Sequence, residues 1–508
     1  MTNAKKLLMN TVLLTAASFV MRTVTVSFNV YLTNKIGADG IGLFQLVFTV
    51  YSLAITFAGA GVRLAAMRMT ADNSATGKYN HRQLMTYCIA YSLICGIVTA
   101  AVMKAGADLI GQKWIEDPRS IRSLKILCIS LPFVSVSMAL NGYFTSVGKL
   151  VRYTAVQLGE QILKIIITVL SLKKVLSEGI EASCAAVTFG IITAQIFSAL
   201  CSYILYRISV CKPVETEKPK DIISSLLRIS VPDATGAVMR SILMTVEHLL
   251  IPVGFRKSGS NPQAALATYG IIHGMSLPLI LYPSALLSSL SGLLVPEISS
   301  HYVAGNKSRI EYMIARVLHL TLIFSIGTSG IMYFNAENLS LAVYSKPDAA
   351  FYVQILSPLI PVMYTDMSVD GMLKGLDQQV SYMRYNIIDS ALCVMLVYLL
   401  VPVFSVKGYI IVVFVSETVN FFLSFRRLTI VADVKIDCFR DIVIPLLCVI
   451  SANLFRKIFF ALFPLGFDVK LCAFFEITVS AALYSVLLIM FRSVDSEEIY
   501  WAKRVISH

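Results

Sequence analysis

The sequence predicts an all-α integral membrane fold: about fourteen transmembrane helices in two pseudo-symmetric six-helix lobes, followed by two appended C-terminal helices. Three observations predict it. The composition is too apolar for a soluble domain, the apolar runs are long enough to span a bilayer, and motifs of the first half return in the second half.

Composition alone places the chain in a membrane. Hydrophobic residues make up 56% of the chain and charged residues only 14%, whereas soluble domains carry about 25% charged residues. Basic loops at an anionic leaflet explain the net charge of +13 better than nucleic acid does, so no nucleic-acid partner is expected. The ten cysteines show no CxxC or Cys/His spacing, which argues against a disulfide framework and against a metal site.

The apolar runs predict the spans, since one crossing takes about 20 residues. The first run, 7–32, has no small-residue cleavage site behind it and is predicted to be a helix rather than a removed signal peptide. Because the number of spans is even, both termini are predicted on one side, and the excess of Lys and Arg makes that side cytoplasmic. The predicted spans centre near residues 20, 54, 94, 134, 162, 196, 240, 280, 322, 362, 393, 418, 451 and 480.

The most polar stretch predicts a division of the chain. "YRISVCKPVETEKPKDIISSLLR" (206–228) has two prolines and alternating charges, which are typical of a linker. The predicted parts are an N-terminal six-helix lobe (1–208), a cytoplasmic linker (209–225), a C-terminal six-helix lobe (226–432), and two extra helices with a cytoplasmic tail (433–508).

Motifs of the first lobe recur in the second. "LPFVSVSMALNGYF" (131–144) aligns with "IPVMYTDMSVDGML" (360–373) at a separation of 229 residues, an offset that also pairs Glu160 with Asp389. "VMR" at 20–22 returns at 238–240. Two lobes with the same even number of helices have the same orientation, as in transporters built from parallel repeats. The duplication therefore predicts a transporter; a non-transporting membrane protein built by duplication is the alternative.

Four segments carry a family resemblance: "NKIGADGIGLFQLVFTVYSLAITFAGAGVRLAAMRM", "NGYFTSVGKL", "QLGEQILKI" and "LLVPEISSHYVAGN". They resemble the stage V sporulation protein B family, a polysaccharide-exporter-like branch of the multidrug/oligosaccharidyl-lipid/polysaccharide (MOP) superfamily. The resemblance implies a bacterial plasma-membrane protein that flips lipid-linked sugar precursors to the outer leaflet, with a link to sporulation and cortex peptidoglycan. The related lipid II flippases share the fold and the two extra helices, which in them form a groove for the lipid tail.

A lipid-linked pyrophosphate needs buried cations, because its charged head has to cross about 30 Å of hydrocarbon. Arginine suits this task, since its guanidinium stays charged and binds phosphate oxygens in pairs. Arg22 and Arg240 lie inside predicted helices and correspond through the VMR match, so they are predicted to grip the pyrophosphate. The alternative is an arginine that snorkels to the membrane surface or is neutralised by a nearby acid, such as Glu247 or Asp233 for Arg240. Arg63 is a third candidate cation or a positive-inside anchor.

The resemblance to lipid II flippases supports Arg22, because their first helix carries a cavity arginine at the matching place. It does not extend to their other arginines. Where they carry a second arginine in the first helix this chain has Phe28, and its eighth helix offers only His273. The resemblance therefore leaves the identity of the substrate open.

Other charged residues in the predicted spans are candidates for a coupling ion or for structural pairs. Glu160 and Lys164 are four residues apart and are expected to neutralise each other. Asp366 aligns with Ser137 and so has no acidic counterpart. The remaining candidates for a proton or sodium ion are Glu247, His248, Asp389 and Glu417.

The repeat also aligns Pro132 with Pro361, and both are predicted to bend their helices. No P-loop or HExxH motif occurs. Neither an enzymatic activity nor a cofactor is therefore expected, and an ion gradient or the membrane potential is the expected driving force.

The predicted function is a flippase for undecaprenyl-linked saccharides that works by alternating access, with peptidoglycan precursors as the expected cargo. Its expected partners are this lipid-linked saccharide and membrane lipids, with cell-wall synthases as an open possibility. Two alternatives remain: an ion-coupled multidrug exporter on the same fold, and a membrane scaffold that recruits cell-wall synthases. The two extra helices and the paired arginines argue against the exporter.

Overall fold

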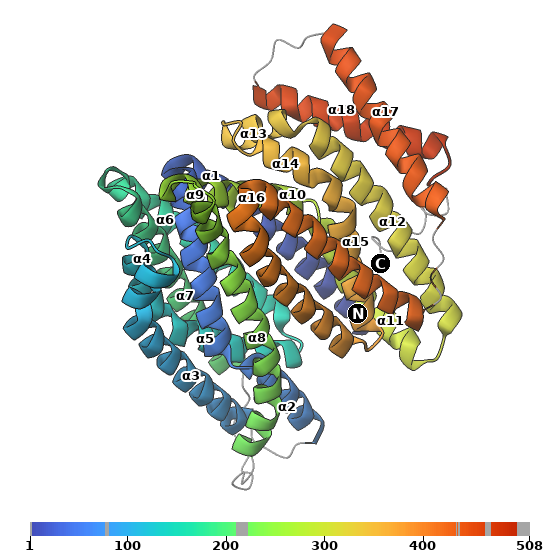
Figure 1. The fold of residues 1–508 in the computed structure, drawn as a ribbon. Coiled ribbons are helices and arrows are strands. Elements are labelled where there is room, and N and C mark those ends of the chain that lie inside the picture. The colour runs from blue at the N-terminus through green and yellow to red at the C-terminus, as the bar shows by residue number, and fades with distance from the viewer. Residues whose placement is uncertain are drawn as a thin grey trace. The chain divides into compact units, whose positions relative to one another are not determined.

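The computed structural model describes residues 3–76, 81–209, 222–432, 434, 437–462 and 469–494. Every regular element in these ranges is a helix, which confirms the predicted all-α fold (Figure 1). Contacts along the chain define two compact units. We call Lys35–Gly270 the middle unit, and Met1–Asn34 together with Ile271–His508 the terminal unit.

Eleven helical stretches among the described residues are long and apolar enough to cross a membrane. Two of them, Phe19–Asn73 and Gln379–Val431, hold 55 and 53 residues, which is more than twice the length of one crossing. Both contain a kink: α1 (Asn3–Gly59) at Gly37, where φ is 77°, and α16 (Gln379–Val431) at Ser405, where φ is 53°. Glycine adopts such a φ freely, whereas serine does so under strain. The chain is a multi-pass membrane protein, and the count of fourteen spans stays a prediction.

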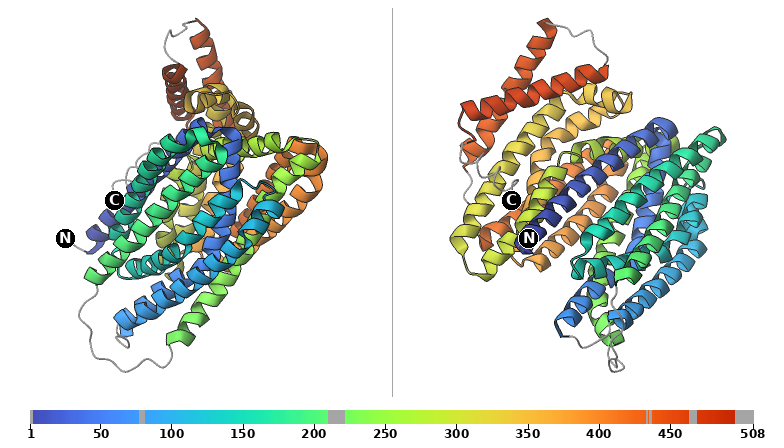
Figure 2. Two further views of the ribbon diagram at one scale, coloured as in Figure 1. Left: turned by 90° about the vertical axis from the view of Figure 1, so that its left-hand side faces the viewer. Right: turned by 180° about the vertical axis from the view of Figure 1, so that it is seen from behind.

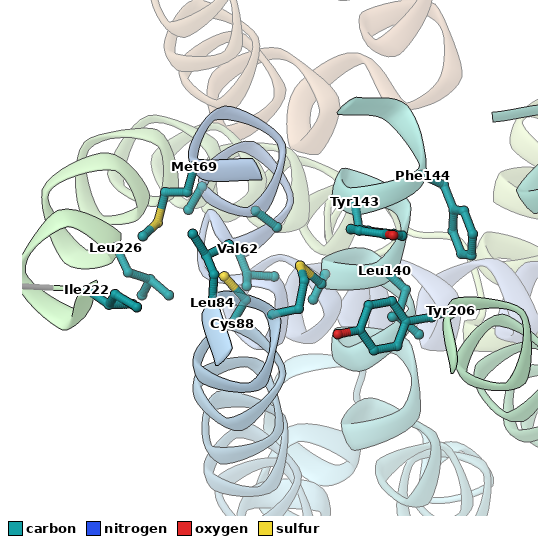
Figure 3. Packing of buried hydrophobic residues seen from close by; sticks show 14 of the residues in the cluster. Val62, Met69, Leu84, Cys88, Leu140, Tyr143, Phe144, Tyr206, Ile222 and Leu226 are labelled. Atoms are coloured by element: carbon teal, nitrogen blue, oxygen red, sulfur yellow. The ribbon is translucent and has the colours of Figure 1, made fainter. Parts of the chain in front are cut away.

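The middle unit is formed by the second part of α1 and the helices that follow it. They are α2 (Val62–Thr76), α3 (His81–Leu109), η1 (Ile110–Trp114), α4 (Ser120–Leu127), η2 (Cys128–Ser130), α5 (Leu131–Ser146), α6 (Leu150–Val175), η3 (Leu176–Glu178), α7 (Ile180–Ser209), α8 (Ile222–Lys257) and α9 (Pro262–Gly270). One buried core joins α2, α3, α5, α7 and α8 through side chains such as Met69, Leu84, Tyr143, Tyr206 and Leu226 (Figure 3).

The terminal unit combines the first part of α1 with the remaining helices. These are η4 (Ile271–Ser276), α10 (Leu277–Leu281), α11 (Ala285–Val303), α12 (Lys307–Phe334), α13 (Ala336–Tyr344), α14 (Ala350–Leu356), η5 (Ser357–Leu359), α15 (Ile360–Gly375), α16, η6 (Phe439–Val443), α17 (Ile444–Leu462) and α18 (Val469–Met490). The appended helices pack on each other, and they contact α12 and α13 rather than extending away alone (Figure 2).

The helix boundaries reproduce the internal repeat. The turn η2 and the helix α5 return as η5 and α15, and each boundary lies 229 residues later. The same offset separates the first residue of α6 from that of α16. Pro132 and Pro361 each lie in the first turn of a helix, directly after a 3₁₀ turn. Proline is well suited to this position, since an N–H there would have no helical partner.

The boundaries of the compact units differ from those of the sequence repeat, because residues 1–34 group with 271–508. The lobes expected at 1–208 and 226–432 stay a prediction from the repeat. Of the expected linker 209–225, residues 210–221 lie outside the described residues, and α8 already begins at Ile222. Residues 495–508 of the expected tail also lie outside them.

Candidate functional site

Arg22 lies in α1 beside a break between α10 and α11. Its Nη2 donates to the carbonyl oxygen of Leu281 at 2.7 Å and to Oγ of Ser284 at 3.0 Å. The Leu281 carbonyl is available because Pro283 interrupts the helix and the N–H of Ala285 bonds to Tyr282 instead. Both acceptors are uncharged, so these contacts orient the guanidinium without cancelling its charge.

Two tyrosines hold the same break. The buried Tyr364 of α15 donates its hydroxyl to the carbonyl oxygen of Ile280 at 2.6 Å. The hydroxyl of Tyr282 lies 3.0 Å from Oγ1 of Thr23, one residue after Arg22. Side chains of α1 and α15 thus satisfy carbonyl groups that the break releases, as buried backbone groups require. This arrangement is not among the predictions from the sequence, although the Tyr-Pro-Ser run at 282–284 is a typical sign of a helix break.

The two positions where related flippases carry further arginines have other roles in this chain. Phe28 is buried, with 6% of its surface exposed. His273 lies in the π-helical turn η4, and its Nε2 is 3.0 Å from the hydroxyl of Tyr409 in α16. Single π-helical turns are frequent at functional sites.

Arg240 lies in the middle of α8 and is half-buried. It forms no hydrogen bond or ion pair with any other described residue. Asp233 and Glu247, two helical turns before and after it, share its side of the helix and do not pair with it. Arg240 is therefore a cation inside a membrane helix without a described counterion.

The other predicted residues of the middle unit are His248, the pair Glu160 and Lys164, and Arg63. His248 of α8 is tied by its Nδ1 to the hydroxyl of Tyr269 at 2.9 Å. Glu160 and Lys164 of α6 lie close enough to attract each other. Arg63, at the start of α2, is exposed and without a partner among the described residues. The backbone of Arg63 lies against α5. A Cβ atom added to Gly142 of α5 would lie 2.4 Å from the carbonyl oxygen of Arg63.

Asp366 belongs to a buried polar cluster of the terminal unit. Its Oδ2 accepts a hydrogen bond from Nδ2 of Asn420 at 2.9 Å, and its Oδ1 has no hydrogen-bond partner among the described residues. Asp389 accepts a hydrogen bond from Ser416 and lies near enough to repel the Asp366 carboxylate. The hydroxyl of Ser424 lies close enough to the Asp366 carboxylate to stabilise its charge, and the side-chain oxygen of Asn420 has no described partner. The cluster thus has free acceptor oxygens next to two carboxyl groups, which suits a proton or a small cation.

Both acids of this cluster are among the residues predicted from the sequence, whereas its neutral members are not. Ser416, Asn420 and Ser424 are spaced four residues apart, so they form one polar stripe on an apolar helix. This polar stripe is the sequence signal that could have identified the neutral members of the cluster. Glu417, also a predicted candidate, is half-buried on the same helix.

A further polar network, also missed, joins the appended helices to the middle of α12. Nδ1 of the buried His319 in α12 is 2.6 Å from Oδ1 of Asp441 in η6. Its Nε2 lies 3.0 Å from the carbonyl oxygen of Ser493, just after α18.

A second network joins them where α12 ends and α13 begins. The buried Arg456 of α17 forms an ion pair with the half-buried Glu476 of α18. It also donates to Oδ1 of Asn335, at 2.6 Å, where α12 ends. Asn338 of α13 donates to Glu476 at 2.8 Å. The appended pair is therefore fixed to the terminal unit by charged and polar contacts at two places.

The chain resembles known proteins over nearly its full length. Residues 7–301 match the family model described as polysaccharide biosynthesis protein. Stage V sporulation protein B of Bacillus subtilis (strain 168) is 21% identical over 506 residues, covering 97% of this chain and 96% of the relative.

Solved structures share the fold. Lipid II flippase MurJ, in an inward closed conformation, matches with a TM-score of 0.72 at 13% identity, over 94% of this chain and 98% of that one. A multidrug resistance MATE family transporter of the MOP superfamily, in an inward-facing conformation, matches with a TM-score of 0.65 at 13% identity, over 81% of this chain and 95% of that one. Both likenesses identify the fold as that of a helical membrane transporter.

Proposed function

Because the chain belongs to the polysaccharide biosynthesis protein family of the MOP superfamily, we propose that it is a flippase for a lipid-linked saccharide. It moves this substrate across the bacterial plasma membrane by alternating access of its two repeat lobes, with both termini in the cytoplasm. Its substrate is an undecaprenyl pyrophosphate saccharide of the peptidoglycan pathway.

The observation that carries this proposal is Arg240, a guanidinium without a described counterion inside a membrane helix. An arginine at the centre of a membrane helix costs about 2.5–3.5 kcal/mol on insertion scales. An anionic ligand or water in a polar cavity offsets that cost. A pyrophosphate is such a ligand, and guanidinium groups bind its oxygens in pairs.

Arg22 supports the same substrate class. Its two described acceptors are neutral, so its charge remains available to an anion. Arg63 is a third cation without a described partner. A cationic drug, by contrast, gains nothing from these groups.

Two findings support the cargo and its biological setting. The relative that matches over 97% of this chain is named for stage V of sporulation, which supports a role in spore-cortex synthesis. The MurJ structure covers 94% of this chain and the MATE structure 81%, which favours a lipid carrier over a drug as the substrate.

Asp366 is the proposed coupling-ion site. Its carboxylate is buried, has one free oxygen, and lies near a second carboxylate. Binding a proton or sodium ion there reduces the repulsion between the two acids. The energy for uphill transport then comes from an ion gradient rather than from a nucleotide.

The same acidic cluster favours a second candidate, an ion-coupled multidrug exporter. The likeness to a multidrug resistance transporter agrees with it. A scaffold for cell-wall synthases is the third reading, and it predicts no transport at all.

Transport in proteoliposomes separates the three. We expect translocation of fluorescent lipid II, at least tenfold slower in Arg240→Gln than in the wild type, and unchanged in Lys174→Gln, an exposed control. Export of a cationic dye without lipid II translocation would replace the flippase with the exporter. Transport of neither compound by the purified wild type would favour the scaffold.

A further inference from the structure

A groove with a volume of about 360 Å³ runs between α6 and α7 in the middle unit. Apolar side chains form most of its wall. It is lined by Arg152, Ala155, Val156, Gly159, Phe197, Cys201, Ile204 and Leu205. We call it the α6–α7 groove.

Gly159 creates the space. A Cβ at this position would already lie 3.3 Å from the ring of Phe197, so any larger side chain fills the groove. From Arg152 to Gly159 the groove follows two turns of α6, about 10 Å at 1.5 Å per residue. This depth is about one third of the hydrocarbon core, as expected for part of an acyl chain that starts at the membrane surface.

The mouth of the groove is basic. Arg152 is exposed, and its Nη1 lies 3.4 Å from Oγ of Ser209 at the end of α7. Lys149 is the N-cap residue of α6 and has no described partner, and Arg207 is exposed nearby on α7. The segments at the mouth, 149–155 and 204–209, contain no acidic residue, and the nearest acid of α6, Glu160, lies beyond Gly159 beside Ser198. The first turn of α6 adds the partial positive charge of a helix N-terminus.

The second half of the chain offers an internal comparison. At the repeat offset of 229 residues, Arg152 corresponds to Ser381 and Gly159 to Ile388. Ile388 is 51% exposed, so a bulky side chain stands where the first half is hollow. The second half keeps a basic residue in this segment, Arg384, but not the hollow, so the hollow at Gly159 is not imposed by the fold.

We propose that the α6–α7 groove binds one anionic phospholipid, with an acyl chain along Val156 and Gly159 and the phosphate at Arg152 and Lys149. Apolar walls select a hydrocarbon chain, and the unbalanced basic mouth selects a negative head group. Basic pockets between membrane helices bind anionic lipids in this way. This site is separate from the residues assigned above to transport.

Native mass spectrometry of the full-length protein, delipidated and then titrated with phosphatidylglycerol or phosphatidylcholine, tests the proposal. We expect phosphatidylglycerol to bind at least fivefold more tightly. Arg152→Gln and Gly159→Leu each reduce that affinity at least fivefold, while Lys174→Gln, at the other end of α6, leaves it unchanged. Equal binding of both lipids, or unchanged binding by both groove variants, would overturn the proposal.

Cys201 gives an independent measurement, because it lines the groove in the unmodified chain. We expect phosphatidylglycerol to slow its alkylation at least threefold in the wild type but not in Arg152→Gln, as read from the Cys201 peptide. Protection by inorganic phosphate alone would contradict the acyl-chain component. A dimer that protects Cys201 without retained lipid would assign the groove to a second copy of the chain instead.

Discussion

Arg22 and Tyr364 bond to consecutive carbonyl groups of one interrupted helix: Arg22 to Leu281 at 2.7 Å, and Tyr364 to Ile280 at 2.6 Å. They come from α1 and α15, which are remote in the sequence. The break after α10 is therefore a shared attachment point for three segments of the terminal unit. Of the two side chains that bond to this break, Arg22 is charged and Tyr364 is not. Substitutions at the two positions can therefore separate the effect of the charge from the effect of the bond.

Arg22→Gln is expected to slow lipid II translocation at least tenfold, and Arg22→Lys to have a smaller effect because it keeps the charge. A hydrogen bond to a charged group contributes about 1.5–3 kcal/mol, so some loss of thermal stability should accompany both. Tyr364→Phe removes a carbonyl ligand without changing charge. If it slows translocation as much as Arg22→Gln, Arg22 acts by fixing the break rather than by binding an anion.

Arg240→Gln is expected to slow lipid II translocation without destabilising the fold. Because Arg240 forms no described hydrogen bond or ion pair and a charge inside a membrane helix is costly, its replacement should leave the stability unchanged or raise it. Translocation should nevertheless fall at least tenfold. Thermal unfolding in detergent and a proteoliposome assay on the same preparation measure the two effects. A stable variant with the wild-type rate would remove Arg240 from the substrate site.

Asp366→Asn is expected to uncouple transport from its driving force. The amide cannot release a proton or offer a negative charge, so translocation should no longer respond to an imposed proton or sodium gradient. Asp348→Asn, an exposed acid of the same unit, is the control. A variant at Asp366 that still responds to both gradients would exclude this cluster as the coupling site.

Breaking the Arg456–Glu476 pair is expected to loosen the appended helices. Glu476→Leu leaves a buried guanidinium unpaired, a loss of about 3–5 kcal/mol. Replacing both residues by leucine should cost much less, since no charge then stays buried. The midpoint of thermal unfolding measures both, with Lys457→Leu next to the pair as an exposed control. Additive effects of the two single changes would contradict the pairing.

Gly142→Ala is expected to destabilise the contact between α2 and α5. The added methyl group would lie 2.4 Å from the carbonyl oxygen of Arg63, and overpacking of this kind typically costs about 1–3 kcal/mol. Gly106→Ala in α3 is the matched control, because its nearest neighbour is 3.6 Å away and alanine favours a helix by about 0.5–1 kcal/mol. Opposite shifts of the unfolding midpoint should result.

The fold could be predicted from the apolar runs and from the internal repeat. Both can be read from the sequence without knowing which helices contact each other. The boundaries of α5 and α15 follow one offset because duplicated segments keep their turns. The kink at Ser405 was not predictable, since serine carries no preference for a positive φ. The spans predicted near 393 and 418 lie on either side of this kink.

The candidate site was likewise predictable only in part. Charged residues such as Arg22 and Asp366 stand out in an apolar run, because placing them in a membrane is costly. Their partners do not stand out. A backbone carbonyl of a broken helix, or Asn420 54 residues away, becomes visible only when the chain is folded. His319 and Asp441 are 122 residues apart, and nothing local marks them as a pair.

Residues 1–34 belong to the terminal unit although they precede the whole middle unit in the chain. A cut between residues 210 and 221 would therefore yield two fragments, neither of which holds all the segments of one unit. The N-terminal fragment would lack α8 and α9, and the C-terminal fragment would lack the arginine that caps the α10 break. During synthesis, the first span must wait for helices made much later before it finds its packing partners.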